Sequence, residues 1–167
     1  MRKMPVTNKE NDFPESDVLV SSTDVKGRIT FVNDAFCRVA GYEREALIGA
    51  PHNLIRHPDV PAAVFADMWA NLKQSKSWMG LVKNRCENGD HYWVSAHVSP
   101  LLDGNRVIGY ESVRRKATRD EITHAQAIYD RINSGKGLVP FGTKVAAFLG
   151  NASWPLMLCF ALLAVIS

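Results

Sequence analysis

The hydrophobic and polar positions of this 167-residue chain change their periodicity along its length. Residues 18–23 and 28–32 are rich in β-branched side chains and are separated by a short turn that ends in glycine, which predicts a β-hairpin. Residues 78–86, 90–102 and 105–117 predict three longer strands, because turns containing Asn-Gly and Asp-Gly divide them. The pattern therefore predicts two strands before a central region and three strands after it.

The central region has helical periodicity. Asn33 is placed to cap a helix that Gly41 ends, and a second short helix is expected over 43–48. Three prolines within 51–61 exclude one continuous helix there, and apolar residues then recur at helical spacing over 60–72. This order predicts an α+β fold, a five-stranded antiparallel sheet with short helices packed on one face. A cleft between the two layers would suit a small ligand.

An amphipathic helix is expected after the sheet, and an apolar segment ends the sequence. Apolar residues at helical spacing run from residue 118 towards Gly135, and 13 of the 16 residues in 152–167 are apolar. Because a full span needs ~20 apolar residues, the segment fits a buried helix, an interfacial segment or a transmembrane helix cut short, and we favour the last. The sequence thus divides into an N-terminal cap (1–17), a sheet domain (18–117), an amphipathic connector helix with a basic juxtamembrane linker (118–144) and an apolar segment that starts a transmembrane anchor (145–167).

The overall composition is that of a soluble globular domain, with 22% charged and 46% hydrophobic residues, but the charge is unevenly distributed. No charged residue follows Lys144, and 114–144 contains seven basic and three acidic residues. Because basic residues flank the cytoplasmic ends of membrane spans, we expect the sheet domain on the cytoplasmic side. Three scattered cysteines predict neither a disulfide framework nor a zinc site. The basic residues lack interleaved aromatics, so nucleic acid is not an expected partner.

The third predicted strand carries a first candidate binding residue. Asn84 alternates with Lys83 and Arg85, which we expect to face water, so Asn84 should face the cleft. A buried amide needs hydrogen-bond partners, and it either bonds a nearby turn or water, or reads the edge of a heteroaromatic ring with its adjacent donor and acceptor. Gly80 on the same face would let a flat ring approach, and Trp78 would be a stacking surface or core bulk.

The densest polar cluster lies in the proline-punctuated segment and consists of His52, Asn53, Arg56, His57 and Asp59. It is either a solvated loop in which Asp59 caps the following helix, or an anion site in which Arg56 and His57 donate to a phosphate or diphosphate. We favour the anion site. A haem would need only one axial histidine, such as His57 or His97.

Other chemistry is poorly supported by the sequence. No pair of histidines or cysteines has the spacing of metal ligands, and no phosphate-binding glycine loop, nucleophile elbow or pair of catalytic carboxylates is present. We therefore expect no metal site and no enzyme.

Several stretches of the sequence resemble PAS domains. They are Ile-Thr-Phe-Val-Asn-Asp-Ala-Phe at 29–36, Gly-Tyr at 41–42 and Asn-Gly-Asp-His-Tyr-Trp-Val at 88–94. Pro-His-Asn-Leu-Ile-Arg-His-Pro-Asp at 51–59, together with 66–69 and 82–85, is similar to the PAS domains of aerotaxis receptors. The resemblance covers about residues 18–134. It implies a PAS fold, non-covalently bound FAD, a membrane anchor downstream, and a HAMP segment that leads to a chemotaxis signalling domain.

The resemblance also implies roles for the residues that match. Arg56, His57 and Asp59 correspond to positions needed for FAD binding, and Asn84 sits where related flavin domains hydrogen-bond the isoalloxazine ring. Further matching positions are Asn33, Phe65, Trp69 and Trp78. His52 and Asn53 occupy the segment in which light-sensing members place a reactive cysteine, so no thiol adduct is expected.

Two positions depart from the pattern of the light-sensing flavin domains. Val94 stands where those domains carry a second asparagine, and Glu111 stands where they carry a glutamine, so the ring contacts should differ. If Glu111 faces inward, it could couple flavin protonation to the sheet.

We therefore expect a sensor of redox or energy state that binds FAD and lies at the cytoplasmic face of the bacterial inner membrane. Its partners would be the HAMP and signalling domains of the same chain, a chemotaxis kinase and coupling protein reached through them, and a second copy in a homodimer. The alternatives are a haem-binding oxygen sensor of the same fold and a ligand-free module that dimerises through the face carrying Trp93. An absorption spectrum distinguishes the three.

Overall fold

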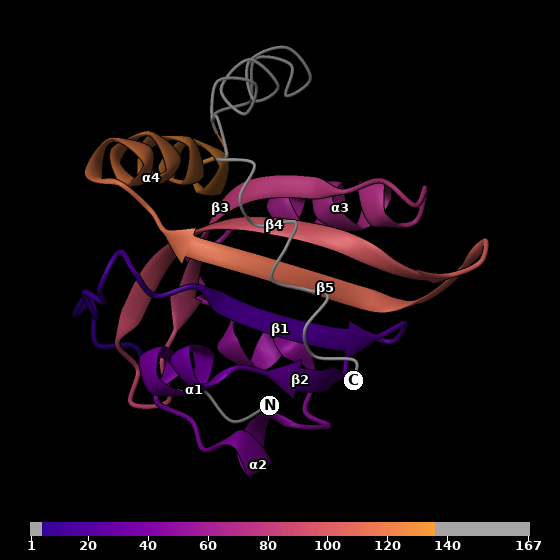
Figure 1. Cartoon of the computed structure of the whole chain (residues 1–167). Helices are drawn as coiled ribbons and strands as arrows, with labels where there is room; N and C mark the ends of the chain where they lie inside the picture. The colour runs from indigo at the N-terminus through magenta and orange to yellow at the C-terminus, as the bar shows by residue number, and fades with distance from the viewer. Residues whose placement is uncertain (1–4, 136–167) are drawn as a thin grey trace. The chain divides into compact units, whose positions relative to one another are not determined.

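The structure is a computed structural model that describes residues 5–135. A five-stranded antiparallel sheet forms its centre, in the order β2-β1-β5-β4-β3 (Figure 1). The strands are β1 (Leu19–Asp24), β2 (Ile29–Val32), β3 (Trp78–Arg85), β4 (His91–Asp103) and β5 (Arg106–Lys116). The predicted five strands are confirmed, and each end lies within one residue of its predicted place. β5 is the central strand, and it joins the β1–β2 hairpin to the β3–β4 hairpin.

Short helices connect β2 to β3. They are α1 (Asp34–Ala40), α2 (Arg44–Leu47), the 3-10 helix η1 (His52–Ile55) and α3 (Ala62–Leu72). Asn33 caps α1 as expected, because its Oδ1 accepts from the N–H of Phe36, and Gly41 ends the helix in the left-handed region, at φ 73°. The break that the prolines predicted is confirmed, since η1 and α3 are separate.

The core lies between these helices and one face of the sheet. Phe36 of α1 packs beneath the guanidinium of Arg114, 5.4 Å from its ring centroid, and Trp69 of α3 meets Tyr110 edge-on. Arg114 and Tyr110 share one face of β5 because they are four residues apart. Among the fully buried side chains are Leu19, Ile29, Leu47, Ile55, Leu72 and Tyr92.

The fifth helix, α4 (Arg119–Asn133), contacts the opposite face. Tyr129 stacks on Trp93, with ring centroids 5.7 Å apart, and its hydroxyl donates to the carbonyl of Leu81. The amphipathic helix predicted after the sheet is therefore confirmed. Trp93 is buried beneath it, and dimerisation through this face stays a prediction.

Burial on this second face overturns one expectation about β3. Lys83 and Arg85 were expected to face water, yet both are buried. Arg85 donates to the carbonyl of Leu54 at 2.8 Å, and Lys83 donates to Asp59 at 2.6 Å. Segments remote in the sequence cover this face and supply acceptors, which the alternation within one strand does not reveal.

The N-terminal segment packs against the start of β4. The main-chain N–H of Asn11 donates to the main-chain carbonyl of His91, and Phe13 is buried edge-on to Tyr92. Glu10 forms a salt bridge with Arg119 at 2.7 Å, and further ion pairs join Asp12 to Lys116 and Arg119. The segment therefore connects the sheet to the first turn of α4.

No helix within residues 5–135 combines the length and the apolar composition that crossing a membrane requires. The apolar segment 145–167 and the end of the basic linker lie outside the described residues, so the membrane anchor stays a prediction.

Candidate functional site

A cavity of about 290 Å³ lies between the sheet and the helices η1 and α3. Residues of β1, β3, β4 and β5 supply its sheet side. Seven of the predicted site residues border it: His52, Asn53, Arg56, Phe65, Trp69, Trp78 and Asn84. The structure therefore brings these seven residues together around one cavity, from the helix side and from β3.

Aromatic side chains form much of the cavity lining. Trp69 lies edge-on to Tyr110 with centroids 5.3 Å apart, and the indole N–H of Trp78 donates to Asp67 at 2.8 Å. Phe65 lies beneath the guanidinium of Arg56, 4.1 Å from its ring centroid. Each ring is fixed by a partner, so the cavity presents an apolar surface of defined shape, as small-molecule sites do.

The space above Gly80 is not open to a ligand. A Cβ built on Gly80 would lie 2.2 Å from the indole of Trp78, so this indole folds across the glycine. The glycine leaves room for a ring, as predicted, but the ring is the protein's own tryptophan.

Two buried polar atoms beside the cavity make no hydrogen bond of good geometry among the described residues, although the Asn84 side chain also interacts with the hydroxyl of Tyr92 on the neighbouring strand. They are Nδ2 of Asn84 on β3 and Oγ of Ser112 on β5. Leaving such a group unpaired costs about 1–3 kcal/mol, so their presence in a cavity indicates a polar ligand. The expectation that Asn84 faces the cleft is confirmed.

Arg114 of β5 also borders the cavity, and sequence reasoning missed it. It is 5% exposed and donates to Ser21, to the carbonyl of Ser112 and to His52. Burial lowers its pKa to about 10, so it stays charged at neutral pH. No acidic side chain within residues 5–135 pairs with it. The sequence does show that Tyr110, Ser112 and Arg114 occupy alternate positions along β5, so the three side chains share one face of the strand.

His52 adds a neutral ring beside this cation. Nε2 of His52 lies 3.0 Å from Arg114 and 3.2 Å from Oγ of Ser21. Burial, and secondly the charge of Arg114, lowers the pKa of His52 to about 3. An arginine can only donate, so Nε2 accepts and the ring proton lies on Nδ1.

The charge around the cavity is positive. Lys26, Arg56 and Arg114 border it, against the single carboxylate of Glu111. Burial raises the pKa of Glu111, which favours the uncharged form of this carboxyl group. The cavity therefore favours an anionic ligand.

Three predicted site residues do not border the cavity. His57 is fully buried beside His91, with ring centroids 5.7 Å apart. Asp59 accepts from Lys83. Pro61 holds the N-cap position of α3, so the alternative in which Asp59 caps this helix is wrong.

The third residue is Asn33, whose side chain makes hydrogen bonds to backbone groups near the start of α1. Its oxygen accepts from the N–H groups of Val20 and Phe36, and its amide donates to the carbonyl of Val18 at 2.8 Å.

The two histidines considered as haem ligands are His57 and His97. Neither is among the residues that line the cavity in the described part of the chain.

Comparison with known proteins identifies relatives of this chain. The aerotaxis receptor of Escherichia coli (strain K12) is 44% identical over 131 residues, which are 78% of this chain and 26% of the receptor. The nitrogen fixation regulatory protein of Klebsiella pneumoniae is 32% identical over 89 residues, 53% of this chain and 18% of that protein. The chain thus spans about a quarter or less of the length of these relatives.

A solved structure shares the fold. The light-state structure of the blue-light photoreceptor Aureochrome1 LOV superimposes with a TM-score of 0.59 at 17% identity, over 69% of this chain and 91% of that chain. The family model described as "PAS fold" matches residues 29–114, just over half of the chain, from β2 to near the end of β5 with all the helices between β2 and β3. With the sheet order, the inserted helices and the cavity between them, this match shows that the chain belongs to the PAS fold family.

Proposed function

We propose that this chain is the sensory region of an aerotaxis receptor, which binds FAD non-covalently in the cavity and reports its redox state. The observation that carries the proposal is the pair of unpartnered polar atoms, on Asn84 and Ser112, beside the buried cation of Arg114. The 44% identity to the aerotaxis receptor supports the assignment to this class of receptor.

The polar atoms fit the edge of a flavin ring. The amide of Asn84 can donate to a ring carbonyl or ring nitrogen, and the hydroxyl of Ser112 can donate or accept. The volume of about 290 Å³ lies at the lower end of small-molecule sites. The ring system is therefore the part of FAD that the cavity would enclose, between walls formed by Trp69 and Trp78.

The positive charges fit the rest of the dinucleotide. Arg56 is half-buried at the cavity wall and Lys26 borders the cavity from the β1–β2 turn. A guanidinium can bind a phosphate through two parallel hydrogen bonds. Arg56 and Lys26 are therefore the residues that we assign to the diphosphate, and Arg114 adds positive charge deeper in the cavity.

A signal needs contacts that differ between two states of the ligand. Bound FAD supplies a redox centre whose charge and hydrogen-bonding pattern depend on its oxidation state. Asn84 on β3 and Ser112 on β5 would exchange hydrogen-bond partners in response. Because α4 packs on the other face of the same sheet, it is the element that would receive the change.

The rest of the receptor is part of the proposal. We place the domain at the cytoplasmic face of the bacterial inner membrane, anchored through the apolar segment 145–167. The HAMP and signalling domains of a longer chain would carry the signal to the chemotaxis kinase and its coupling protein, and the receptor would act as a homodimer.

An absorption spectrum of the purified protein tests the proposal. We expect a yellow protein that releases FAD on denaturation, and we expect Arg56→Ala and Asn84→Ala to lower its FAD content, whereas Arg38→Ala, at an exposed salt bridge with Asp17, leaves it unchanged. A Soret band would establish a haem protein instead. A colourless protein that takes up no FAD would defeat the proposal.

A further inference from the structure

The segment 56–60 passes the edge of β3 and reaches the cavity at its first residue. Arg56 borders the cavity and donates to the carbonyl of Val60 at 3.1 Å. Its backbone forms an isolated antiparallel bridge with Asn84, whose amide faces the same cavity. The beginning of the segment is therefore part of the ligand-binding wall.

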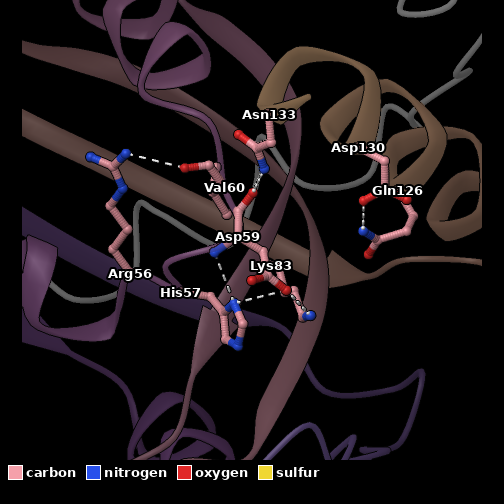
Figure 2. A network of polar contacts seen from close by, with 8 residues as sticks. All are labelled: Arg56, His57, Asp59, Val60, Lys83, Gln126, Asp130 and Asn133. Carbon is pink, nitrogen blue, oxygen red and sulfur yellow. Dashed lines mark hydrogen bonds and ion pairs between the residues drawn. The ribbon is translucent and has the colours of Figure 1, made fainter. Parts of the chain in front are cut away.

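The same segment is bonded to α4 at Asp59. The carboxylate of Asp59 accepts from Nζ of Lys83 at 2.6 Å, and its main-chain carbonyl accepts from the amide of Asn133 at 2.9 Å. Asn133 is the last residue of α4. Figure 2 shows Asp59 between Lys83 on the strand and Asn133 on the helix. One residue thus connects the edge of the sheet to the end of the helix.

Burial makes this connection stronger than an ordinary surface ion pair. The side chain of Lys83 is 7% exposed, and its Nζ lies 6.0 Å from the centroid of the Trp93 ring on which Tyr129 stacks. The side chain of Asp59 is 43% exposed, so water screens part of the attraction. Removing its carboxylate would still leave the buried cation of Lys83 without an acid, which costs more than losing a fully exposed pair. Lys83 therefore depends on Asp59 for the geometry around α4.

Charge states support the same contacts. Burial raises the pKa of Asp59, but the hydrogen bond and charge of Lys83 outweigh it, so the pKa lies below its usual value. Nδ1 of His57 accepts from the N–H of Asp59 at 3.2 Å, and burial lowers the pKa of His57 to about 4. At neutral pH the carboxylate of Asp59 is ionised and the imidazole of His57 is neutral, so the carboxylate pairs with Lys83.

We propose that Asp59 is a positioning residue that links the occupancy of the cavity to the docking of α4, without touching the ligand. The inference rests on the proposed function, because FAD is the ligand whose binding it links. A ligand that fixes Arg56 also fixes the four residues after it, and with them the contacts to Lys83 and Asn133. By thermodynamic reciprocity, loosening α4 weakens FAD binding by the factor by which FAD tightens α4.

The first test removes the contact from the helix side. Asn133→Ala deletes the amide that bonds Asp59, and the matched control Gln126→Ala deletes an amide of the same helix that bonds only Asp130. In FAD titrations of the whole chain we expect Asn133→Ala to weaken binding about two- to tenfold, the factor for one hydrogen bond, and Gln126→Ala to have no effect. Equal effects, or none, would overturn the link.

The reciprocal measurement is amide hydrogen exchange. We expect FAD to slow exchange in the last turn of α4, and we expect Asn133→Ala to remove that slowing while Gln126→Ala retains it. If the exchange rates of α4 in the unaltered chain are the same with and without FAD, the helix is not coupled to occupancy of the cavity.

A charge exchange separates positioning from ligand contact. Asp59→Asn should lower FAD affinity, and the double variant Asp59→Lys with Lys83→Asp should recover part of it, because the ion pair is restored in reverse. If Asp59 touched FAD, the double variant would bind no better than Asp59→Asn. That result, or an Asp59→Asn variant of full affinity, would refute the positioning role.

The failure of the two proposals can be told apart. If the unaltered chain takes up no FAD, the proposed function fails, and the link to FAD fails with it. The contact itself is then judged in ligand-free protein, where Asp59→Asn should speed exchange in the last turn of α4 and Gln126→Ala should not. If the chain binds FAD and α4 does not respond, only the further inference is wrong.

Discussion

Arg114 places a full positive charge within the core, beside a cavity and without an acidic partner among the described residues. Burying a charge in this way costs stability. The hydrogen bonds to Ser21, Ser112 and His52 offset part of that cost. Such an arrangement is typical of a binding site, where stability is lower than a purely apolar core would allow.

Arg114→Met should therefore separate stability from binding. Methionine fills much of the same volume without a charge, so the free energy of unfolding of the ligand-free protein should stay within about 1 kcal/mol or rise. FAD affinity should fall, because the cavity loses its deepest cation. Urea unfolding with and without FAD measures both. A large loss of stability without FAD would contradict the assignment.

Gly80→Ala tests the packing of the indole across β3. The added methyl group would lie 2.2 Å from the Trp78 ring, so the indole must rotate and lose its bond to Asp67. Overpacking of this kind costs about 1–3 kcal/mol, and the wall of the cavity changes with it. We expect lower stability, a shifted tryptophan fluorescence and weaker FAD binding. Unchanged fluorescence would show that the Trp78 ring does not lie across Gly80.

Single residues were predictable where the local pattern decides their direction. Alternation along β3 put Asn84 towards the cavity, which the structure confirms. The same rule failed for Lys83 and Arg85, because segments far away in the sequence cover them and accept their hydrogen bonds. The positions of His57 and Asp59 outside the cavity lining depend equally on tertiary contacts.

At the scale of elements, α4 shows why helix ends were predicted well. Thr118 accepts from the N–H of Glu121, and the carboxylate of Glu121 accepts from the N–H of Thr118, which is a capping box. Arg115 of β5 forms a salt bridge with the same carboxylate at 2.6 Å. The turn between β5 and α4 is therefore fixed by side chains close together in the sequence.

Thr118→Ala should loosen the start of α4. The loss of a capping hydroxyl costs about 1 kcal/mol, whereas Thr123→Ala, at an exposed site within the same helix, replaces threonine by a better helix former. We expect thermal unfolding to show a lower Tm for Thr118→Ala only. An equal fall in both variants would mean that composition, and not the cap, fixes this helix.

For the whole molecule, buried histidines make stability depend on pH. Burial first, and then the charge of Arg114, lowers the pKa of His52 to about 3. The pKa of His57 falls to about 4 through burial and then the charge of Lys83. The usual histidine pKa of about 6.5 applies to the unfolded chain. Between this pH and the lower pKa values of the folded chain, the unfolded chain therefore binds more protons. The stabilisation is complete above about pH 6.5 and is lost as the pH falls towards 4.

Urea unfolding at about pH 7 and about pH 4.5 measures this dependence. We expect lower stability at the acidic pH, with a slope of up to about 1.4 kcal/mol per pH unit for each histidine. His52→Asn should flatten the slope. A stability that is constant or rises on acidification would contradict the burial of these rings.

The fold of the sheet domain was predictable as a whole, because turns and alternation fix the five strands in order. The sequence did not show that α4 covers the Trp93 side of the sheet, since the apolar face of an amphipathic helix does not specify the surface on which it packs. In the structure, Tyr129 stacks on Trp93 and defines that surface. The apolar segment beyond it stays a prediction.

The strand order also sets a time at which the protein can acquire its ligand. β5 is the last strand to leave the ribosome, yet it lies between β1 and β4. Until it is made, the N-terminal hairpin and the β3–β4 hairpin share no backbone hydrogen bonds, and the cavity lacks Ser112 and Arg114. A nascent chain that ends before β5 therefore has no complete pocket, and loading of FAD, the ligand we propose, would follow synthesis of the whole domain.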